Sequence, residues 1–340
     1  MLDVAKRREK NRLTVPGLVL ILGILVVAAW WNWASLPYAA SAATKVLVVE
    51  PGATADEVGR ELASQHLIRS AWAFSRLAVA EKVDEQLKPG EYYISAALSP
   101  EEIINLLLKG PNVGMVHVTV PEGYTTKQII ALLAAKGLGT QQSFENVVEK
   151  DSFPYSFLRG APAGPFRLEG FLFPDTYFFK KGTSPHDIIN TFLQRFSREL
   201  TPAVQTELQK EGLSVHDWVT LSSIVEAEAQ KEKDRPLIAS VYFNRLRKHM
   251  KLEADATVQF ALGKHKPVLY DKDLLTPSPY NTYLHYGLPP GPICNPGHAS
   301  LDAVLHPAAT DYLYYVAEGD GYHVFARTYA GQLRNERKYQ

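Results

Sequence analysis

The chain of 340 residues contains a single cysteine, Cys294, and carries no net charge, because 36 basic side chains balance 36 acidic ones. One cysteine excludes an intramolecular disulfide and a cysteine-based zinc site, and no His-Glu-x-x-His helix offers another metal cage. The charge balance argues against an extended nucleic-acid surface, which needs a basic excess. The glycine-rich signatures of dinucleotide and nucleoside triphosphate sites are also missing. We therefore expect no metal, no cofactor and no nucleic-acid partner.

The amino-terminal region contains a long apolar run. An uncharged segment, 15–34, follows a basic tail, 1–14, and twenty residues of helix span about 30 Å, the thickness of a bilayer core. Basic flanks stay on the cytoplasmic side, so we expect a single-pass helix in the inner (cytoplasmic) membrane with the rest of the chain outside. A cleaved signal peptide ending near residues 39–42 is the alternative. Three tryptophans are expected at the exit interface: Trp30, Trp31 and Trp33.

A weak internal repeat follows the apolar run. Residues 46–67 and 116–138 share the pattern of a strand, a turn rich in proline and glycine, and a capped helix. The second copy predicts a further strand-helix unit, or a connector, over residues 111–167.

The first copy belongs to a small module over residues 44–110. A strand at 91–95 follows a proline-glycine turn, and Ser99 and Glu102 then form the capping-box pattern at the start of another helix. We expect a βααβ module with a further helix. A unit of this kind either binds glycan chains or acts as a spacer or docking surface, and the residues leave both open.

From residue 168 to 340 the chain reads as a larger α+β domain. Periodic apolar residues predict helices over 184–200, 214–230 and 236–250. Stiff loops rich in proline and glycine follow near 276–283 and 287–292, and such loops hold side chains at fixed positions.

The helix at 214–230 places a carboxyl group among apolar residues. Leu221, Ile224, Val225 and Glu228 recur at i, i+3, i+4 and i+7, whereas Glu226 lies about 200° away around the helix. Only one of the two glutamates is then expected to face the packed side.

A carboxyl group held against apolar neighbours has a pKa raised toward neutral, where it can donate a proton. Glu228 is therefore the candidate general acid. The alternative is a structural ion pair between Glu228 and an arginine such as Arg235 or Arg245.

Taken together, these segments resemble the membrane-anchored endolytic murein transglycosylases with a YceG-like catalytic domain. Glu253 and Ala256 depart from the resemblance, since glutamine and proline are common at these two positions. The motifs that carry the resemblance are Glu169-Gly-Phe-Leu-Phe-Pro-Asp-Thr-Tyr177, Ser223-Ile-Val-Glu-Ala-Glu228, Ile238-Ala-Ser-Val-Tyr-Phe-Asn-Arg-Leu246, Asp255-Ala-Thr-Val258, Tyr280-Asn-Thr-Tyr283 and Gly287-Leu-Pro-Pro-Gly-Pro-Ile293.

The resemblance implies a membrane helix, a LysM-like module and a catalytic domain that cleaves peptidoglycan glycan strands and forms 1,6-anhydro ends. It implies that Glu228 is the essential acid, that no cofactor is needed, and that peptidoglycan synthases of the elongation machinery are partners. The candidate substrate-binding residues are Asn281, Tyr283, Tyr280, Asp255 and Thr282; for the first three, a loop locked by its own hydrogen bonds is the alternative, and Asp255 alternatively caps a turn. The candidate supporting residues are Glu226, Arg235, Asn244 and Arg245.

Two other functions stay open at this point. A muramidase would use Glu228 with a second carboxylate, Asp255 or Glu226, and would release reducing ends. A non-catalytic cell-wall scaffold would bind glycan through the module at 44–110 and recruit synthases.

Overall fold

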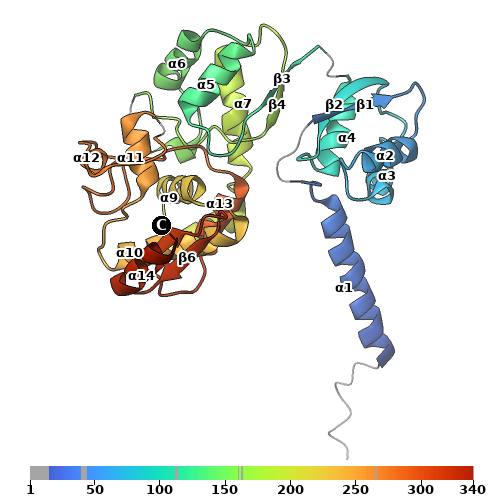
Figure 1. Cartoon of the computed structure of the whole chain (residues 1–340). Helices are drawn as coiled ribbons and strands as arrows, with labels where there is room; N and C mark the ends of the chain where they lie inside the picture. Colours follow the sequence, from blue (N-terminus) through green and yellow to red (C-terminus); the bar gives the residue numbers. More distant parts are fainter. Residues whose placement is uncertain are drawn as a thin grey trace, which may run out of the picture. The chain divides into compact units, whose positions relative to one another are not determined.

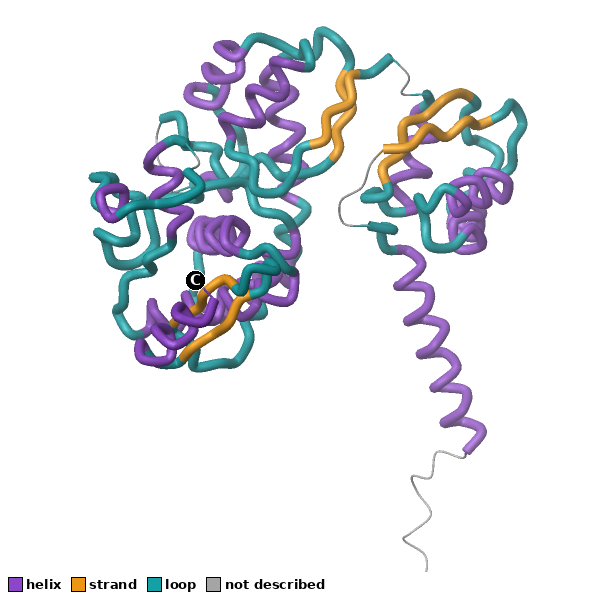
Figure 2. The backbone as a smooth tube through the Cα atoms, viewed as in Figure 1, coloured by secondary structure: helices purple, strands orange, loops and turns teal. Residues whose placement is uncertain are grey.

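The computed structural model describes residues 15–39, 44–111, 114–159, 161, 164–264 and 266–339, with side chains from residue 23 onward. The chain divides into two compact units, Met1–Gly114 and Met115–Gln340. Figures 1 and 2 show their helices and strands. The basic tail predicted at 1–14 and most of the alternative cleavage site lie outside the described residues.

The first unit has the strand-helix-helix-strand order that the sequence predicts, preceded and followed by a helix. Strands β1 and β2 are antiparallel, with Thr44 opposite Ser95 and Val49 opposite Gly90. The capping box of α4 is present, since the Ser99 hydroxyl accepts from the Glu102 amide at 3.2 Å and the Glu102 carboxylate accepts from the Ser99 amide at 3.0 Å. The elements are α1 (Val15–Ser35), β1 (Thr44–Val49), α2 (Ala55–Ser64), α3 (Ala71–Ala80), β2 (Gly90–Ser95) and α4 (Pro100–Lys109).

Helix α1 covers the segment that the sequence predicts as membrane-spanning. Its side chains are described from Gly23 to Ser35, and Ile24 to Val27 are all more than half exposed. Among the residues that the structure describes, no helix reaches the length and apolarity needed to cross a membrane.

The second unit is a mixed α+β structure in which helices outweigh two small antiparallel sheets, β3 with β4 and β5 with β6. The helices predicted over 184–200, 214–230 and 236–250 correspond to α7, α9 and α10. The elements are β3 (Val116–Thr119), α5 (Thr126–Ala135), α6 (Gln141–Lys150), η1 (Ser156–Leu158), β4 (Thr176–Phe179), α7 (Pro185–Ser197), α8 (Pro202–Glu211), α9 (Val215–Glu228), η2 (Glu232–Asp234), α10 (Arg235–Arg247), α11 (Asp255–Leu262), α12 (Asp271–Leu274), α13 (His298–Leu305), β5 (Tyr314–Ala317), β6 (His323–Ala326) and α14 (Tyr329–Tyr339).

The segment predicted as a connector, 111–167, shares a core with the segment predicted as catalytic, 168–340. Val116 of β3 lies opposite Phe179 of β4, and apolar residues from both segments form one buried cluster. The strand pairing spans residues far apart in the sequence, so local patterns alone do not indicate it.

Helix α9 lies in the interior of the second unit, between α10, α11 and α13 (Figure 1). Its Trp218 indole donates to the Leu301 carbonyl of α13 at 2.9 Å. On the same helix, the Ser223 hydroxyl accepts from the Ile293 amide at 3.0 Å, which ties the proline-glycine loop to the helix. These bonds fix the direction of α9, and therefore the place at which it ends.

Gly170 allows two of the sequence motifs to approach each other. Its φ is +87°, and an added Cβ would lie 2.5 Å from a side-chain carbon of Pro292 and 2.7 Å from one of Val219. A side chain at this position is therefore excluded by both backbone conformation and space.

Candidate active site

The middle of helix α9 is buried on all sides, and Glu226 is enclosed as well as Glu228, which corrects the expectation that only one of the two glutamates faces packed surroundings. Every residue from Trp218 to Val225 is buried. The Glu226 side chain is only 7% exposed, and the Glu228 carboxyl is enclosed as well. The face argument fails because other elements also cover the side of the helix on which Glu226 lies, so each glutamate has its own polar partners.

Glu228 is the last residue of α9, and its carboxyl is the candidate acid. The Ala256 amide donates to Glu228 Oε1 at 3.3 Å, and the side chain also shares a hydrogen bond with Tyr315. Burial raises the pKa of Glu228 to about 7, the charge of Asp255 adds to the rise, and the bonds from Ala256 and Tyr315 oppose it. The residue as a whole keeps some exposure. Glu228 can therefore hold a proton near neutral pH and still be reached.

Asp255 and Tyr283 lie beside this acid. Asp255 is the first residue of α11, and the Tyr283 hydroxyl donates to its Oδ1 at 2.6 Å. Burial raises the pKa of Tyr283 above its ordinary value, and the bond to Asp255 and the nearby charge of Glu228 raise it further. The structure thus brings together three of the residues that the sequence indicates: Glu228, Asp255 and Tyr283.

Asn281 and Thr282 hold the site loop from within and do not present themselves to a substrate. Asn281 is fully buried, its amide donates to the carbonyls of Leu274 and Thr276, both at 2.9 Å, and its Oδ1 accepts from the Tyr283 amide at 2.9 Å. Thr282 is 1% exposed, and its hydroxyl accepts from the Ala254 amide at 3.0 Å. Sugar contact by either side chain does not fit this burial.

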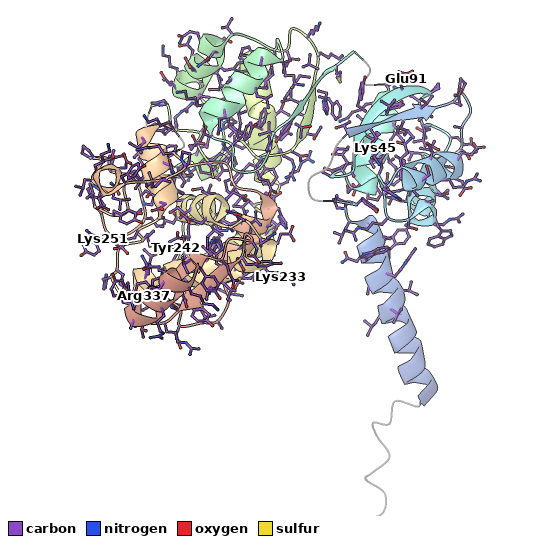
Figure 3. The ribbon with its side chains drawn as sticks, in the orientation of Figure 1. Lys45, Glu91, Lys233, Tyr242, Lys251 and Arg337 are labelled. Carbon is purple, nitrogen blue, oxygen red and sulfur yellow. The ribbon has the colours of Figure 1, made fainter. Side chains whose placement is uncertain are left out.

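Tyr280 is also an interior residue of this loop. It is 7% exposed and packs against Phe166 and Phe260, with ring centroids 5.8 Å and 4.8 Å away. Burial raises the pKa of its phenol to about 12. From outside the loop, the Lys251 ammonium (Figure 3) donates to the Tyr283 carbonyl at 2.8 Å. These contacts make Tyr283 the outward member of the Tyr-Asn-Thr-Tyr motif.

Arg235 forms an ion pair with Glu226 rather than with Glu228. Its Nη2 lies 3.1 Å from Glu226 Oε1 and 4.0 Å from Glu122 Oε2, and its Nε donates to Ser300 Oγ at 2.8 Å. The Gly297 amide donates to the second oxygen of Glu226 at 3.1 Å. A Cβ at Gly297 would lie 1.9 Å from the Glu122 carboxylate. Glu226 therefore anchors α9 to the start of α13.

Asn244 and Arg245 of α10 hold the chain that leads into β5. The Asn244 amide donates to the carbonyls of Thr310 and Tyr312, at 2.8 Å and 2.9 Å. The Arg245 guanidinium donates to the Leu313 carbonyl at 2.7 Å and pairs with Glu253 at 3.0 Å. Both residues support the acid indirectly, since the strand that they position carries Tyr315.

Three contributors to the site were missed from the sequence. Tyr315 hydrogen-bonds Glu228, and its hydroxyl lies 2.6 Å from that of Tyr242 (Figure 3), which is 1% exposed. The Ala256 amide is the third, and a proline at this position, common in the resembled family, would have no N–H to donate. The tyrosine-rich run 312–315 was the available signal for Tyr315, whereas a backbone donor leaves no signal in the sequence.

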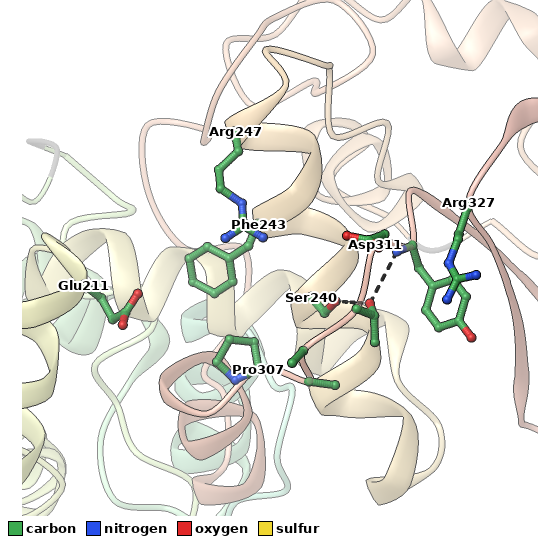
Figure 4. Close-up of a pocket in the computed structure, with 11 residues that line it drawn as sticks. Glu211, Ser240, Phe243, Arg247, Pro307, Asp311 and Arg327 are labelled. Carbon is green, nitrogen blue, oxygen red and sulfur yellow. Dashed lines mark hydrogen bonds between the residues drawn. The ribbon is translucent and has the colours of Figure 1, made fainter.

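A separate cavity of about 520 Å³ is lined by residues of α10 and the segment 307–312, and includes Arg247 and Arg327 (Figure 4). The Ser240 and Thr310 hydroxyls hydrogen-bond across its wall. None of the candidate site residues lines it. Among the described residues, no group of three or more histidine, cysteine, aspartate or glutamate side chains could hold a metal ion.

Comparison with known proteins decides the family. The YceG-like family matches residues 47–338. The chain belongs to this family. A relative from Bacillus subtilis (strain 168), named endolytic murein transglycosylase, is 35% identical over 309 residues, covering 86% of this chain and 83% of the relative. A protein of the same name from Streptococcus pneumoniae serotype 2 is 30% identical, covering 83% of this chain and 56% of its own length.

A crystal structure described as that of a yceG-like protein from Listeria monocytogenes has the same YceG-like fold. It aligns with a TM-score of 0.58 and 33% sequence identity, and the match covers 87% of this chain and 100% of the other.

Proposed function

We propose that this protein is an endolytic lytic transglycosylase that cleaves the β-1,4 bond between N-acetylmuramic acid and N-acetylglucosamine in nascent peptidoglycan. Membership of the YceG-like family and the names of the curated relatives support the substrate class. The observation that carries the proposal is the state of Glu228, a carboxyl with a pKa of about 7 in a residue that keeps some exposure.

A single carboxyl group suffices for this reaction. Protonated Glu228 donates its proton to the glycosidic oxygen as the bond from C1 to that oxygen breaks. The C6 hydroxyl of the same muramic acid attacks C1 and closes a 1,6-anhydro ring, and its proton passes to the Glu228 carboxylate. No water is consumed, and Glu228 returns to its protonated form.

The neighbours of Glu228 stabilise the charges that form during the reaction. When Glu228 becomes a carboxylate, the Ala256 amide and the Tyr315 hydroxyl are already in place to donate to it. The Asp255 carboxylate, held by Tyr283, favours the positive charge of an oxocarbenium-like transition state. Asn281 contributes by fixing the backbone of Tyr283.

A two-carboxylate muramidase is the second candidate, and the charge of Asp255 near Glu228 is the observation that favours it. In such an enzyme Asp255 would act as nucleophile or would activate water. The Tyr283 hydroxyl donates a short hydrogen bond to one Asp255 oxygen, which makes that oxygen a weaker nucleophile or base.

Product chemistry tests the choice between the two enzymes. Purified peptidoglycan digested by the full chain is expected to yield strands ending in 1,6-anhydro-muramic acid. These products are lighter than hydrolysed ones by one water and do not react with borohydride, so mass spectrometry before and after reduction distinguishes them. Incorporation of heavy oxygen from labelled water at C1 would identify a muramidase instead.

The pH dependence of turnover is expected to follow the surroundings of Glu228. The acid must be protonated, so kcat/KM should fall above pH about 7. Tyr315→Phe removes a bond that lowers the pKa of Glu228, so the alkaline limb should move to higher pH. Asp255→Asn removes a charge that raises this pKa, so the limb should move to lower pH. Shifts of the same sign in the two variants, measured on purified peptidoglycan, would contradict this assignment.

In the same proposal the protein works at the outer face of the inner membrane. The uncharged run of α1 after a basic tail supports a single-pass anchor with a cytoplasmic amino terminus. The β1-α2-α3-β2 order supports a LysM-like module, and peptidoglycan synthases of the elongation machinery are the proposed partners. Protease added to spheroplasts should digest the catalytic unit, and its protection would overturn this orientation.

A further inference from the structure

Helix α3 of the first unit exposes large apolar side chains on its outward face, where a helix facing water is normally polar. Trp72, Arg76 and Val79 recur at i, i+4 and i+7, and Trp72 and Val79 are 56% and 44% exposed. The opposite face packs into the core of the unit through Phe74 and Ala78, both fully buried. Because α3 already has a buried face, its outward face with Trp72 and Val79 is available to a partner outside the unit.

This face is continuous with the end of α1. The Trp72 ring centroid lies 5.7 Å from that of Trp30 and 6.3 Å from that of Trp31. Further back along α1, Leu25 and Val26 are 59% and 62% exposed. Indole rings favour the boundary between hydrocarbon and headgroups, so three contacting tryptophans at the end of an apolar helix suit that depth in a bilayer.

Two arginines accompany the aromatic cluster. The Arg76 guanidinium lies 5.8 Å from the Trp72 ring centroid, and the Arg69 guanidinium lies 5.2 Å from that of Trp33. Arg69 also donates to the Pro37 carbonyl at 2.9 Å, which ties the chain after α1 to the module. Guanidinium groups beside interfacial indoles are placed to pair with phosphate oxygens of lipid headgroups.

We propose that the face of α3 formed by Trp72, Arg76 and Val79 docks on the outer leaflet of the membrane that α1 anchors. The inference rests on the anchor described under the proposed function. We expect this face to bind an anionic bilayer surface, because the face is continuous with α1 and because two arginines accompany it. Docking would hold the module flat on the membrane, so glycan would be engaged close to the bilayer surface.

The sheet of the same unit also exposes valines, and it provides the comparison. Val48 of β1 is 51% exposed, close to the exposure of Val79. Its register partner is Glu91 of β2 (Figure 3), and residues directly opposite each other in an antiparallel pair share a face. A carboxylate on that face disfavours contact with anionic lipid, so the sheet is not the expected docking surface.

Environment-sensitive fluorophores on single cysteines test the proposal in the full chain. The only native thiol, Cys294, is buried, and burial raises its pKa well above the ordinary value, so it should not compete for label. Val79→Cys reports on α3, Val48→Cys is the matched control, and Val26→Cys reports on the anchor. Each labelled chain is reconstituted into vesicles of phosphatidylethanolamine and phosphatidylglycerol with a spin-labelled lipid as quencher.

The label at position 79 is expected to shift its emission to the blue and to be quenched several-fold more than the label at position 48. Replacing phosphatidylglycerol with phosphatidylcholine, or introducing Arg76→Glu, should reduce quenching at position 79 and leave position 26 unchanged. A quenched label at 26 with an aqueous label at 79 would overturn the docking and keep the anchor. An aqueous label at position 26 would overturn both the docking and the membrane anchor. Turnover measured in detergent tests the proposed chemistry separately. Equal quenching at 79 and 48 would mean nonspecific adsorption and would also overturn the proposal.

Discussion

Replacing Glu228 with glutamine is expected to lower turnover on purified peptidoglycan by about 10²–10⁴-fold, the range that general acid catalysis contributes. The amide keeps the shape of the side chain but has no proton to transfer. Burial disfavours the charged form of Glu228 and so raises its pKa. A neutral amide in its place should therefore leave the melting temperature unchanged or higher. The assay is release of soluble glycan followed by mass spectrometry, with a thermal melt of the same sample.

Glu226→Gln is the matched control, since it makes the same substitution two residues earlier on α9. Its carboxylate pairs with Arg235 and accepts from the Gly297 amide, so the change should lower stability and leave most of the turnover. Equal loss of turnover in both variants, or unfolding of Glu228→Gln, would remove the basis for assigning the acid. Full activity of Glu228→Gln would also contradict Glu228 as the acid. If Glu228→Gln loses cleavage but still binds glycan, the protein is an enzyme and not a scaffold.

Replacing Arg235 with methionine is expected to lower the free energy of unfolding by about 3–5 kcal/mol, the typical effect of breaking a buried ion pair from one side. Arg235 is 8% exposed and lies between two carboxylates, those of Glu226 and Glu122. Methionine keeps the apolar stem and removes the charge, so both carboxylates lose their cation. Urea unfolding followed by circular dichroism measures the change.

Two further variants make this result specific to the buried cluster. Arg60→Met breaks an exposed pair with Asp56, whose side chains are 66% and 63% exposed, and should change stability very little. The double variant Arg235→Met, Glu226→Gln should regain part of the lost stability, because one carboxylate is then neutral. If the two single effects simply add, Arg235 and Glu226 do not form the coupled pair proposed here.

Local patterns in the sequence predict a helix or strand well where the signals for that element lie within or next to its own residues. Ser99 and Glu102 form their capping box through neighbouring residues, so the start of α4 follows from four positions of sequence. The order of β1, α2, α3 and β2 likewise follows from turns and periodicity within each segment.

The surroundings of the candidate site depend on distant segments, and there sequence reasoning is weaker. The pattern of Leu221, Ile224, Val225 and Glu228 pointed to the acid, but it could not show that Glu226 would also be enclosed, since that depends on Arg235 and Gly297. Asn281 has the residue type expected of a sugar ligand, yet both N–H groups of its amide donate to backbone carbonyls, those of Leu274 and Thr276. Hydrogen-bond partners, rather than residue type, separate the two roles.

The start of the short helix α11 places a partial positive charge beside the Glu228 carboxyl, in addition to the hydroxyl of Tyr315. The first turn of a helix has amides without intrahelical partners, and Ala256 belongs to that turn of α11. Glu228 itself closes α9, where the unpaired carbonyls of a helix end carry partial negative charge. The two helix ends thus act on one carboxyl in opposite directions, and with a pKa of about 7 its two protonation states have nearly equal free energy in neutral solution. An acid that must become a base within one turnover is served by that near-equality, because neither protonation state is scarce at neutral pH.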